Sequence, residues 1–255
     1  DAEVEAYVES FETPEVEDEE EAAPTHEFAD LEIGRIRYIA REGEGTPVFL
    51  IHGFGGDSDN WLFNIDSINA KAPVYAIDLP GHGQSIKKID NPDVRTMVSA
   101  VMQLMDHLDT EKAHLVGHSM GGLIAGKCAE EFEERVASIT MICSAGLGDE
   151  INNEYINGFV SAKSRKELKP TLKNLFADQS LVSRSMVDEL LKYKRLDGVQ
   201  EFLESLSANL FSEGLQTIKI LDELNTKKIP VTVIWGAQDA VIPSNHANVL
   251  DNAKV

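Results

Sequence analysis

The chain has 255 residues, and 44 acidic against 23 basic residues give it a net charge of −21. Hydrophobic residues make up 42% of the sequence, enough to bury a core, so a wholly disordered chain is excluded. No apolar run approaches the ~18–20 residues that a membrane span needs, and so acidic a protein binds polyanions poorly. We therefore expect neither a membrane nor a nucleic acid as a partner.

The two cysteines, Cys128 and Cys143, are too few for a disulfide framework or a zinc cluster. A protein of a reducing compartment shows this usage. We therefore expect a cytoplasmic protein with no metal site.

The first part of the chain differs in composition from the rest. Residues 1–12 carry apolar side chains at helical spacing, and residues 13–29 hold two prolines and an acidic run from Glu15 to Glu21 that only Val16 interrupts. Like charges repel, and little in this stretch can be buried. We expect residues 1–12 to close an upstream domain, 13–29 to be a linker, and 30–255 to form the main domain. Because the sequence starts at Asp1 rather than Met, we expect it to be part of a longer protein.

The main domain alternates strand and helix patterns. Apolar runs typical of buried strands occur at 47–51, 73–77, 113–116, 136–142 and 231–235, after a turning strand at 31–38. Between them, residues 94–108 show helical spacing after the cap-like pair Asn91-Pro92, and residues 123–132 are a second helix. This alternation predicts an α/β fold, with a mostly parallel sheet flanked by helices.

Residues 146–224 break the alternation. Their leucines and other apolar residues recur at helical spacing, and no strand signal interrupts them. We expect an inserted helical cap over the sheet. The stretch 161–200 carries nine basic against five acidic residues, a local +4 in an acidic chain.

The motif Gly117-His118-Ser119-Met120-Gly121 follows one predicted strand and precedes one predicted helix. A nucleophile on such a tight turn has a strained backbone, and the two glycines allow the chain to turn sharply. The turn lifts the Ser119 hydroxyl out of the surface and aims the Met120 N–H, at the positive end of the helix, toward an oxyanion. Ser119 is therefore the predicted nucleophile.

Two further loops follow predicted strands. His52-Gly53-Phe54-Gly55-Gly56 is a glycine-rich turn that allows a ligand to approach the backbone closely, and His52 fits a hydrogen-bonded structural residue better than a base. The segment 236–243 places Asp239 on a loop after the last strand, where a triad acid orients an imidazole.

The segment 78–85, DLPGHGQS, is interpreted as structural loop chemistry. A direct catalytic role for Asp78 or His82 is the less favoured alternative.

In this order and spacing, the motifs HGFGG, DLPGHGQS, GHSMGG and GAQDAVIP resemble the α/β-hydrolase superfamily over residues 31–255. The resemblance implies an eight-stranded, mostly parallel sheet, a cap, and a Ser-His-acid triad. It also implies that the Phe54 N–H is the second oxyanion donor, with His52, Gly53, Gly117, His118 and Gly121 supporting the two loops.

A narrower resemblance rests on GGDSDNWLFN (55–64), SRKELKPTLKNLFAD (164–178) and LLKYKRLDGVQ (190–200). These segments are similar to the acyltransferase component (dihydrolipoyllysine-residue acetyltransferase) of acetoin dehydrogenase complexes, and residues 1–11 to the end of its lipoyl domain. The family joins a lipoyl domain to an α/β-hydrolase-type domain. The resemblance implies transfer of an acetyl group from an upstream lipoyl-lysine to coenzyme A, with other subunits of such a complex as partners and no cofactor bound by residues 1–255.

A triad also needs a histidine after Asp239, and only His246 follows it. His246 lies in a segment, 244–250, that has the pattern of a short helix rather than of a loop after a strand. We expect the missing strand, the histidine loop and a final helix to lie beyond Val255, with His246 as the alternative base. The present segment alone is then expected to be nearly inert, because a serine without its base is a weak nucleophile.

Three functions stay open: acyl transfer to a thiol, hydrolysis of an ester, thioester or carbon–carbon bond, and a non-catalytic scaffold. The first and second use the same loops and differ in the acceptor. The cap cations could hold the phosphates of coenzyme A, dock the acidic linker, or simply be solvated: Lys163, Arg165, Lys166, Lys169, Lys192, Lys194 and Arg195.

Overall fold

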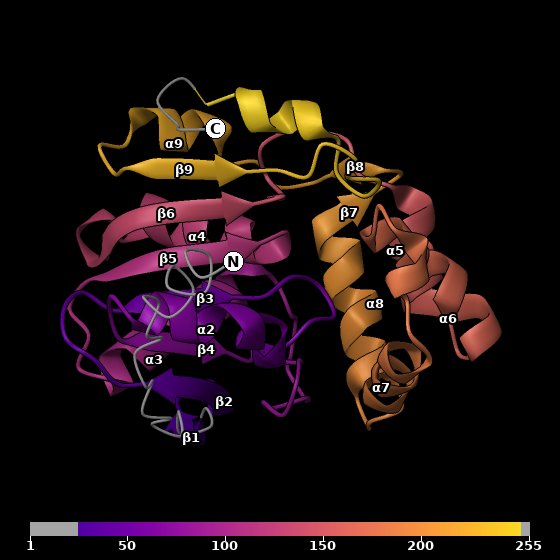
Figure 1. Ribbon diagram of the computed structural model, residues 1–255, viewed down its shortest axis with the longest axis horizontal. Helices are drawn as coiled ribbons and strands as arrows, with labels where there is room; N and C mark the ends of the chain where they lie inside the picture. The colour runs from indigo at the N-terminus through magenta and orange to yellow at the C-terminus, as the bar shows by residue number, and fades with distance from the viewer. Residues whose placement is uncertain (1–24, 251–255) are drawn as a thin grey trace, which may run out of the picture.

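The computed structural model describes residues 25–250 and shows a seven-stranded sheet beside a helical cap (Figure 1). The strand order is β1-β2-β4-β3-β5-β6-β9. β2 pairs antiparallel with β1 and β4, and the other neighbours are parallel. The strands are β1 Thr25–Leu31, β2 Gly34–Arg41, β3 Val48–Ile51, β4 Val74–Ile77, β5 Ala113–His118, β6 Val136–Ile142 and β9 Val231–Ile234. The predicted α/β class with a mostly parallel sheet is confirmed.

The central strands are buried on both faces, as their continuous apolar runs predict. On β3, Phe49 and Ile51 pack with one layer of helices, α3 (Val94–His107) and α4 (Met120–Glu131). Val48 and Leu50 pack on the opposite face against Trp61 and the helix α2 (Leu62–Asn69). This alternation follows from the period of two along a strand. Helix α3 begins at Val94, two residues after Pro92, because the Asp93 side chain caps it by accepting from Thr96 N at 2.8 Å.

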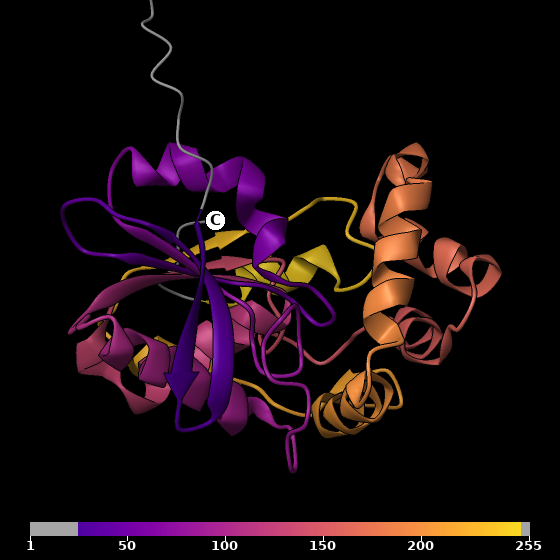
Figure 2. The same ribbon diagram turned by 90° about the horizontal axis from the view of Figure 1, so that it is seen from below.

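The cap contains α5 (Asn153–Ser161), α6 (Arg165–Leu172), α7 (Arg184–Lys194) and α8 (Val199–Leu210), with the short 3-10 turns η3 (Lys173–Leu175) and η4 (Gln179–Leu181). In Figure 1 the arrows of β6 and β9 point toward these helices, and Figure 2 shows the same arrangement from below. The carboxyl ends of the parallel strands therefore face the cap. Three more 3-10 turns lie outside it: η1 (Ser58–Trp61), η2 (Glu133–Arg135) and η5 (Ser244–Asn248).

We expected the segment 146–224 to be helical throughout, and this prediction is wrong for part of it. After α8 the chain forms a small hairpin, β7 (Phe211–Ser212) and β8 (Leu215–Gln216), whose turn has positive φ at Glu213 and Gly214. The helix α9 (Leu221–Thr226) then packs against α4 beside the sheet rather than in the cap. Two-residue strands have no periodicity that a sequence pattern could reveal.

The predicted linker 13–29 is wrong for its last five residues. Residues 25–29 belong to β1, where Ala29 is fully buried and pairs with Ile36. Backbone pairing with β2 orders this stretch, although His26, Glu27 and Phe28 are exposed. The predictions for residues 1–24, and for a strand beyond Val255, fall outside the described residues. Within residues 25–250, no helix combines the length and the apolar character that crossing a membrane requires.

Candidate active site

Ser119 occupies the turn between β5 and α4 with φ 53° and ψ −117°, a strained backbone for a residue other than glycine. Close backbone contacts on both sides demand glycine. A Cβ on Gly117 would lie 2.1 Å from Gly121 O, and a Cβ on Gly121 would lie 2.1 Å from Ile51 O. The two glycines of the motif therefore let α4 approach β3 and β5 closely enough to form the predicted turn.

Backbone hydrogen bonds hold Ser119 in this conformation. Its N–H donates to Ile142 O at 2.9 Å, and its carbonyl accepts from Gly122 N and Ala145 N at 3.0 Å each. The residue is half-buried, and its hydroxyl has no hydrogen-bond partner among residues 25–250. Ser119, the predicted nucleophile, is thus fixed through its backbone, while its hydroxyl is left without a partner in the described chain.

The loop after β3 lies against the nucleophile. A Cβ on Gly53 would come within 3.2 Å of both Ser119 Cβ and His118 Nδ1. Gly56 N donates to Gly53 O at 3.0 Å and closes the turn around Phe54. Among the described residues, the N–H groups of Phe54 and Met120 have no acceptor. These two groups are available for a ligand, and their role as oxyanion donors stays a prediction.

His52 is fully buried behind this loop. Its Nε2 accepts from Leu79 N at 3.0 Å, and its Nδ1 lies 2.8 Å from Gly53 O. Burial lowers the pKa of His52 to about 4, so the ring is neutral at physiological pH. Both ring nitrogens are occupied by backbone groups, which suits the predicted structural role and leaves no nitrogen for a base.

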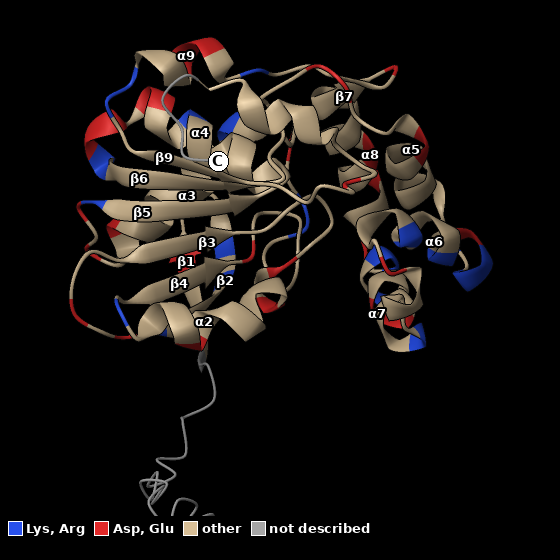
Figure 3. Cartoon of the chain, turned by 45° about the horizontal axis from the view of Figure 1, so that its top comes forward, with Lys and Arg blue, Asp and Glu red and all other residues tan. Residues whose placement is uncertain are grey.

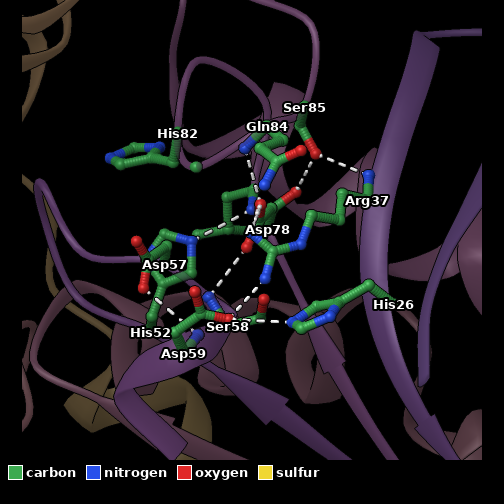
Figure 4. Close-up of polar contacts among 12 residues, drawn as sticks. His26, Arg37, His52, Asp57, Ser58, Asp59, Asp78, His82, Gln84 and Ser85 are labelled. Carbon is green, nitrogen blue, oxygen red and sulfur yellow. Dashed lines mark hydrogen bonds and ion pairs between the residues drawn. The ribbon is translucent and has the colours of Figure 1, made fainter. Parts of the chain in front are cut away.

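Asp78 anchors the next loop, as Figure 4 shows. Its fully buried carboxylate accepts from Ser58 N at 2.8 Å and from Gln84 N at 2.7 Å, and it lies 3.5 Å from Arg37 Nη1. Ser85 Oγ donates to Asp78 O at 2.6 Å and accepts from Arg37 N at 2.9 Å. This network ties β2, η1 and the loop after β4 together, which is structural chemistry rather than catalysis.

Arg37 is the member of this network that the sequence did not reveal. It lies on β2, its side chain is 3% exposed, and it also pairs with Asp59. No motif surrounds Arg37. The sequence signal that could have revealed this network is an arginine at an inward position of a predicted strand. A buried charge needs a partner, so such an arginine predicts a nearby carboxylate.

Asp239 lies on the loop after β9, as predicted. Its Oδ1 accepts from Val241 N at 2.8 Å and from Ile242 N at 3.0 Å. Burial raises the pKa of the Cys143 thiol to about 11, and the Asp239 carboxylate contributes to this rise. Cys143 directly follows Ile142, the residue that accepts from Ser119 N. Asp239 and Ser119, the predicted acid and nucleophile, therefore belong to the same edge of the sheet.

His246, the alternative base, points elsewhere. The residue is 3% exposed, its Nε2 lies 2.8 Å from a carboxylate oxygen of Glu150, and its ring packs against Trp235. All seven histidines lie within residues 25–250, and none of them hydrogen-bonds Ser119 or Asp239 in that part of the chain. His246 therefore does not complete a triad in this arrangement.

The cap cations have different surroundings. Lys194 is buried, and its ammonium donates to the carbonyls of Phe159 and Val160 at the end of α5. Arg165 pairs with Asp188. The donors of these two side chains are engaged within the cap, which argues against the phosphate and linker alternatives for them and, for the buried Lys194, against solvation as well. All of the cap cations except Lys194 are exposed: Lys163, Arg165, Lys166, Lys169, Lys192 and Arg195. Figure 3 shows basic residues on α6 and α7, and α6 lies on the side of the cap away from the sheet.

Two clefts border the cap. One, of about 620 Å³, runs from Lys87 and Lys88 to Glu201 and Phe202, and the other, of about 540 Å³, lies between α5 and α8. Neither is lined by Ser119 or Asp239. The described residues also contain no cluster of three or more side chains arranged to hold a metal ion.

Comparison with known proteins places this geometry in a family. Residues 46–254 match the alpha/beta hydrolase fold family. The chain is 47% identical to the dihydrolipoyllysine-residue acetyltransferase component of the acetoin cleaving system of Cupriavidus necator, over 97% of this chain and 66% of that protein. It is 41% identical to the component of the same name from Pseudomonas putida, over 100% of this chain and 70% of that protein. It thus spans about two thirds of the length of these relatives.

A solved structure of a meta-cleavage product hydrolase superposes with a TM-score of 0.79 at 26% identity, covering 89% of this chain and 87% of that one. Fold, motif order and sequence identity agree with one another. The chain belongs to the α/β-hydrolase fold family, and within that family it groups with the dihydrolipoyllysine-residue acetyltransferase components of acetoin cleaving systems.

Proposed function

We propose that the protein transfers an acyl group through a covalent intermediate on Ser119. The observation that carries this proposal is the conformation of Ser119, held at φ 53° with a free hydroxyl beside two backbone N–H groups that lack an acceptor in the described chain. In the reaction, Ser119 Oγ attacks the carbonyl of a thioester and its proton passes to a base. The N–H groups of Phe54 and Met120 stabilise the resulting oxyanion.

We propose acetyl as the acyl group, the thiol of dihydrolipoyl-lysine as the leaving group, and coenzyme A as the acceptor. The leaving thiolate takes the proton from the base as the tetrahedral intermediate collapses to an acetyl-serine. The coenzyme A thiol then gives its proton to the same base and attacks the ester, and Ser119 regains its proton. The identity of 47% and 41% with proteins named dihydrolipoyllysine-residue acetyltransferase components supports the choice of acetyl and of dihydrolipoyl-lysine. In this scheme Asp239 orients the base.

Hydrolysis is the second candidate, favoured by the likeness to a meta-cleavage product hydrolase. Water would replace coenzyme A in the second step, and the same loops would serve. Assembly with other subunits of an acetoin cleaving system belongs to the first candidate only, since it rests on the names of the relatives.

The test is the intact mass of the full-length protein after exposure to an acetyl thioester, with and without coenzyme A. We expect an acetyl adduct that maps to Ser119, that coenzyme A discharges, and that the Ser119→Ala variant does not form. Discharge at the same rate by water alone would make the protein a hydrolase. Absence of any Ser119 adduct would contradict both candidates.

A further inference from the structure

Two fully buried histidines lie side by side behind the candidate oxyanion hole. His52 belongs to the loop after β3 and His82 to the loop after β4, and their ring centroids are 4.8 Å apart. Neither has a role in the chemistry proposed above. Both are visible in Figure 4, beside the Asp78 network.

Each histidine reaches across to the other one's loop. His52 Nε2 accepts from Leu79 N at 3.0 Å, and His82 Nε2 accepts from Gly55 N at 3.1 Å. In each ring the other nitrogen, Nδ1, faces a carbonyl of its own loop, Gly53 O at 2.8 Å and Pro80 O at 3.0 Å. A carbonyl only accepts, so Nδ1 must carry the proton and Nε2 must be the acceptor. Both rings are therefore neutral and in one defined tautomer.

These bonds fix the two peptide groups that flank Phe54. The Gly53 carbonyl shares a planar trans peptide with the Phe54 N–H, and the two point in opposite directions. His52 Nδ1 and Gly56 N both donate to that carbonyl, at 2.8 and 3.0 Å, so they set the direction of the Phe54 N–H. The following peptide carries the Gly55 N–H, which His82 holds.

The cap seats His82 in this position. Its ring stacks at 15° on Tyr193 of α7 and meets Phe202 of α8 edge-on, with centroids 6.4 and 5.2 Å away. Tyr193 OH donates to Gly81 O at 2.9 Å. The ammonium of Lys87 donates to the carbonyls of His82, Gly83 and Ser85. His82 therefore has packing on its faces and a fixed backbone, which leaves Gly55 N as the natural partner of its Nε2.

We propose that His52 and His82 are positioning residues that jointly aim the Phe54 N–H at the acyl oxygen. The inference rests on the proposed function, since it takes Phe54 as an oxyanion donor. A different ring nitrogen acts in each residue. At His52, Nδ1–H donates to Gly53 O and so orients the Phe54 N–H. At His82, Nε2 accepts from Gly55 N and so fixes the peptide group that follows Phe54.

This assignment predicts a crossover between amide substitutions. The amide of asparagine occupies the place of Nδ1, and that of glutamine the place of Nε2. At position 82, His82→Gln keeps the bond to Gly55 and His82→Asn loses it. At position 52, His52→Asn keeps the bond to Gly53 O and His52→Gln loses it. We expect Ser119 acylation by an acetyl thioester to fall roughly 10²–10³-fold in H82N and H52Q, the loss typical of one oxyanion donor, and within about tenfold in H82Q and H52N.

The measurements use the full-length protein. His114→Asn is the matched control: His114 bonds Ser138 at 2.7 Å on the sheet, and its substitution should leave acylation unchanged. Amide hydrogen exchange measures the hydrogen bond from Gly55 N to His82 independently of activity. The Gly55 amide should be protected in the wild type and in H82Q, and should exchange faster in H82N. The same loss at both positions for Asn and Gln, following the loss of stability, would overturn the proposal in favour of packing alone. An unprotected Gly55 amide in the wild type would also overturn it. Protected amides in a wild type that never acylates would contradict the proposed function and, with it, the role of Phe54.

Discussion

The loops after β3 and β4 and the loop after β9 lie at the same edge of the sheet, but different contacts hold them. We call the loops after β3 and β4 the oxyanion side, and the loop after β9 the acid side, after their predicted roles. On the oxyanion side, His52, Asp78 and His82 are fully buried and bind backbone groups of other loops. On the acid side, Asp239 is half-buried and its Oδ1 binds N–H groups two and three residues further along the chain. Near it Ile234 is 51% exposed.

This difference predicts in which loops a substitution changes the stability of the protein as well as its chemistry. Contacts between loops distant in sequence contribute to the global fold, whereas a loop held by its own backbone can change without unfolding the rest. Substitutions on the oxyanion side should therefore destabilise the protein, and those on the acid side should mainly change its chemistry.

Asp239→Asn should give the largest effect, and only on activity. The asparagine oxygen can still accept from Val241 N and Ile242 N, so the free energy of unfolding should change by less than about 1 kcal/mol. Loss of the charge that supports an imidazolium should slow Ser119 acylation about 10⁴-fold in the full-length protein. Acylation kinetics check the predicted rate, and urea unfolding checks the predicted free energy of unfolding. An unchanged acylation rate would remove Asp239 from the mechanism.

Gly121→Ala should be the most destabilising change. The new Cβ would lie 2.1 Å from Ile51 O and 2.7 Å from His52 O, both backbone atoms of a buried strand and its loop. We expect a loss of about 3 kcal/mol or more. Gly236→Ala, on the acid side, is the matched control, because nothing lies within 4 Å of its Cβ position. Urea unfolding should leave that control within about 0.5 kcal/mol of the wild type. Equal losses in the two variants would contradict the comparison.

Asp78→Asn should cost about 3 kcal/mol. The change leaves the buried Arg37 guanidinium with Asp59 as its remaining partner, and an undercompensated buried charge is expensive. The control is Asp197→Asn, whose ion pair with Lys88 is exposed at 87% and 79% of the two side chains. That substitution should be within about 0.5 kcal/mol of neutral. Chemical denaturation of both variants measures these losses in the free energy of unfolding. A loss near zero in Asp78→Asn would contradict the prediction and show that water or another group reaches Arg37.

The sequence predicted the parts of this arrangement that are local. Strand–turn–helix patterning and the glycines around Ser119 suffice to predict the nucleophile turn, because close backbone contacts must be made by glycine wherever they occur. The hydrogen bond from Gly55 N to His82 and the ion pair between Arg37 and Asp78 join residues that are 27 and 41 positions apart. Such pairings depend on how the strands are ordered in the sheet, which periodicity does not contain. The hairpin β7–β8 and the start of β1 were missed for a similar reason, since pairing rather than composition creates them.

The smallest effect should appear in the pH dependence of stability. His52 has a pKa of about 4 when folded, lowered by burial, against 6.5 for the free side chain. Between these values the unfolded chain binds a proton that the folded chain does not, so stability is full above pH 6.5 and falls as the pH falls toward 4. Burial also lowers the pKa of His82, which acts in the same direction.

Asp57 opposes this trend. Burial and the nearby Asp78 raise its pKa to about 6, so the folded chain binds a proton between pH 6 and 3.8 that the unfolded chain does not. We therefore expect urea midpoints of the wild type to fall from pH 7 to pH 4.5, less steeply in His52→Asn and more steeply in Asp57→Asn. This order separates the two residues, although both lie behind the same loop. Identical slopes for the wild type and His52→Asn would mean that His52 gains its proton as readily in the folded as in the unfolded chain, which is incompatible with a ring buried between Leu79 N and Gly53 O.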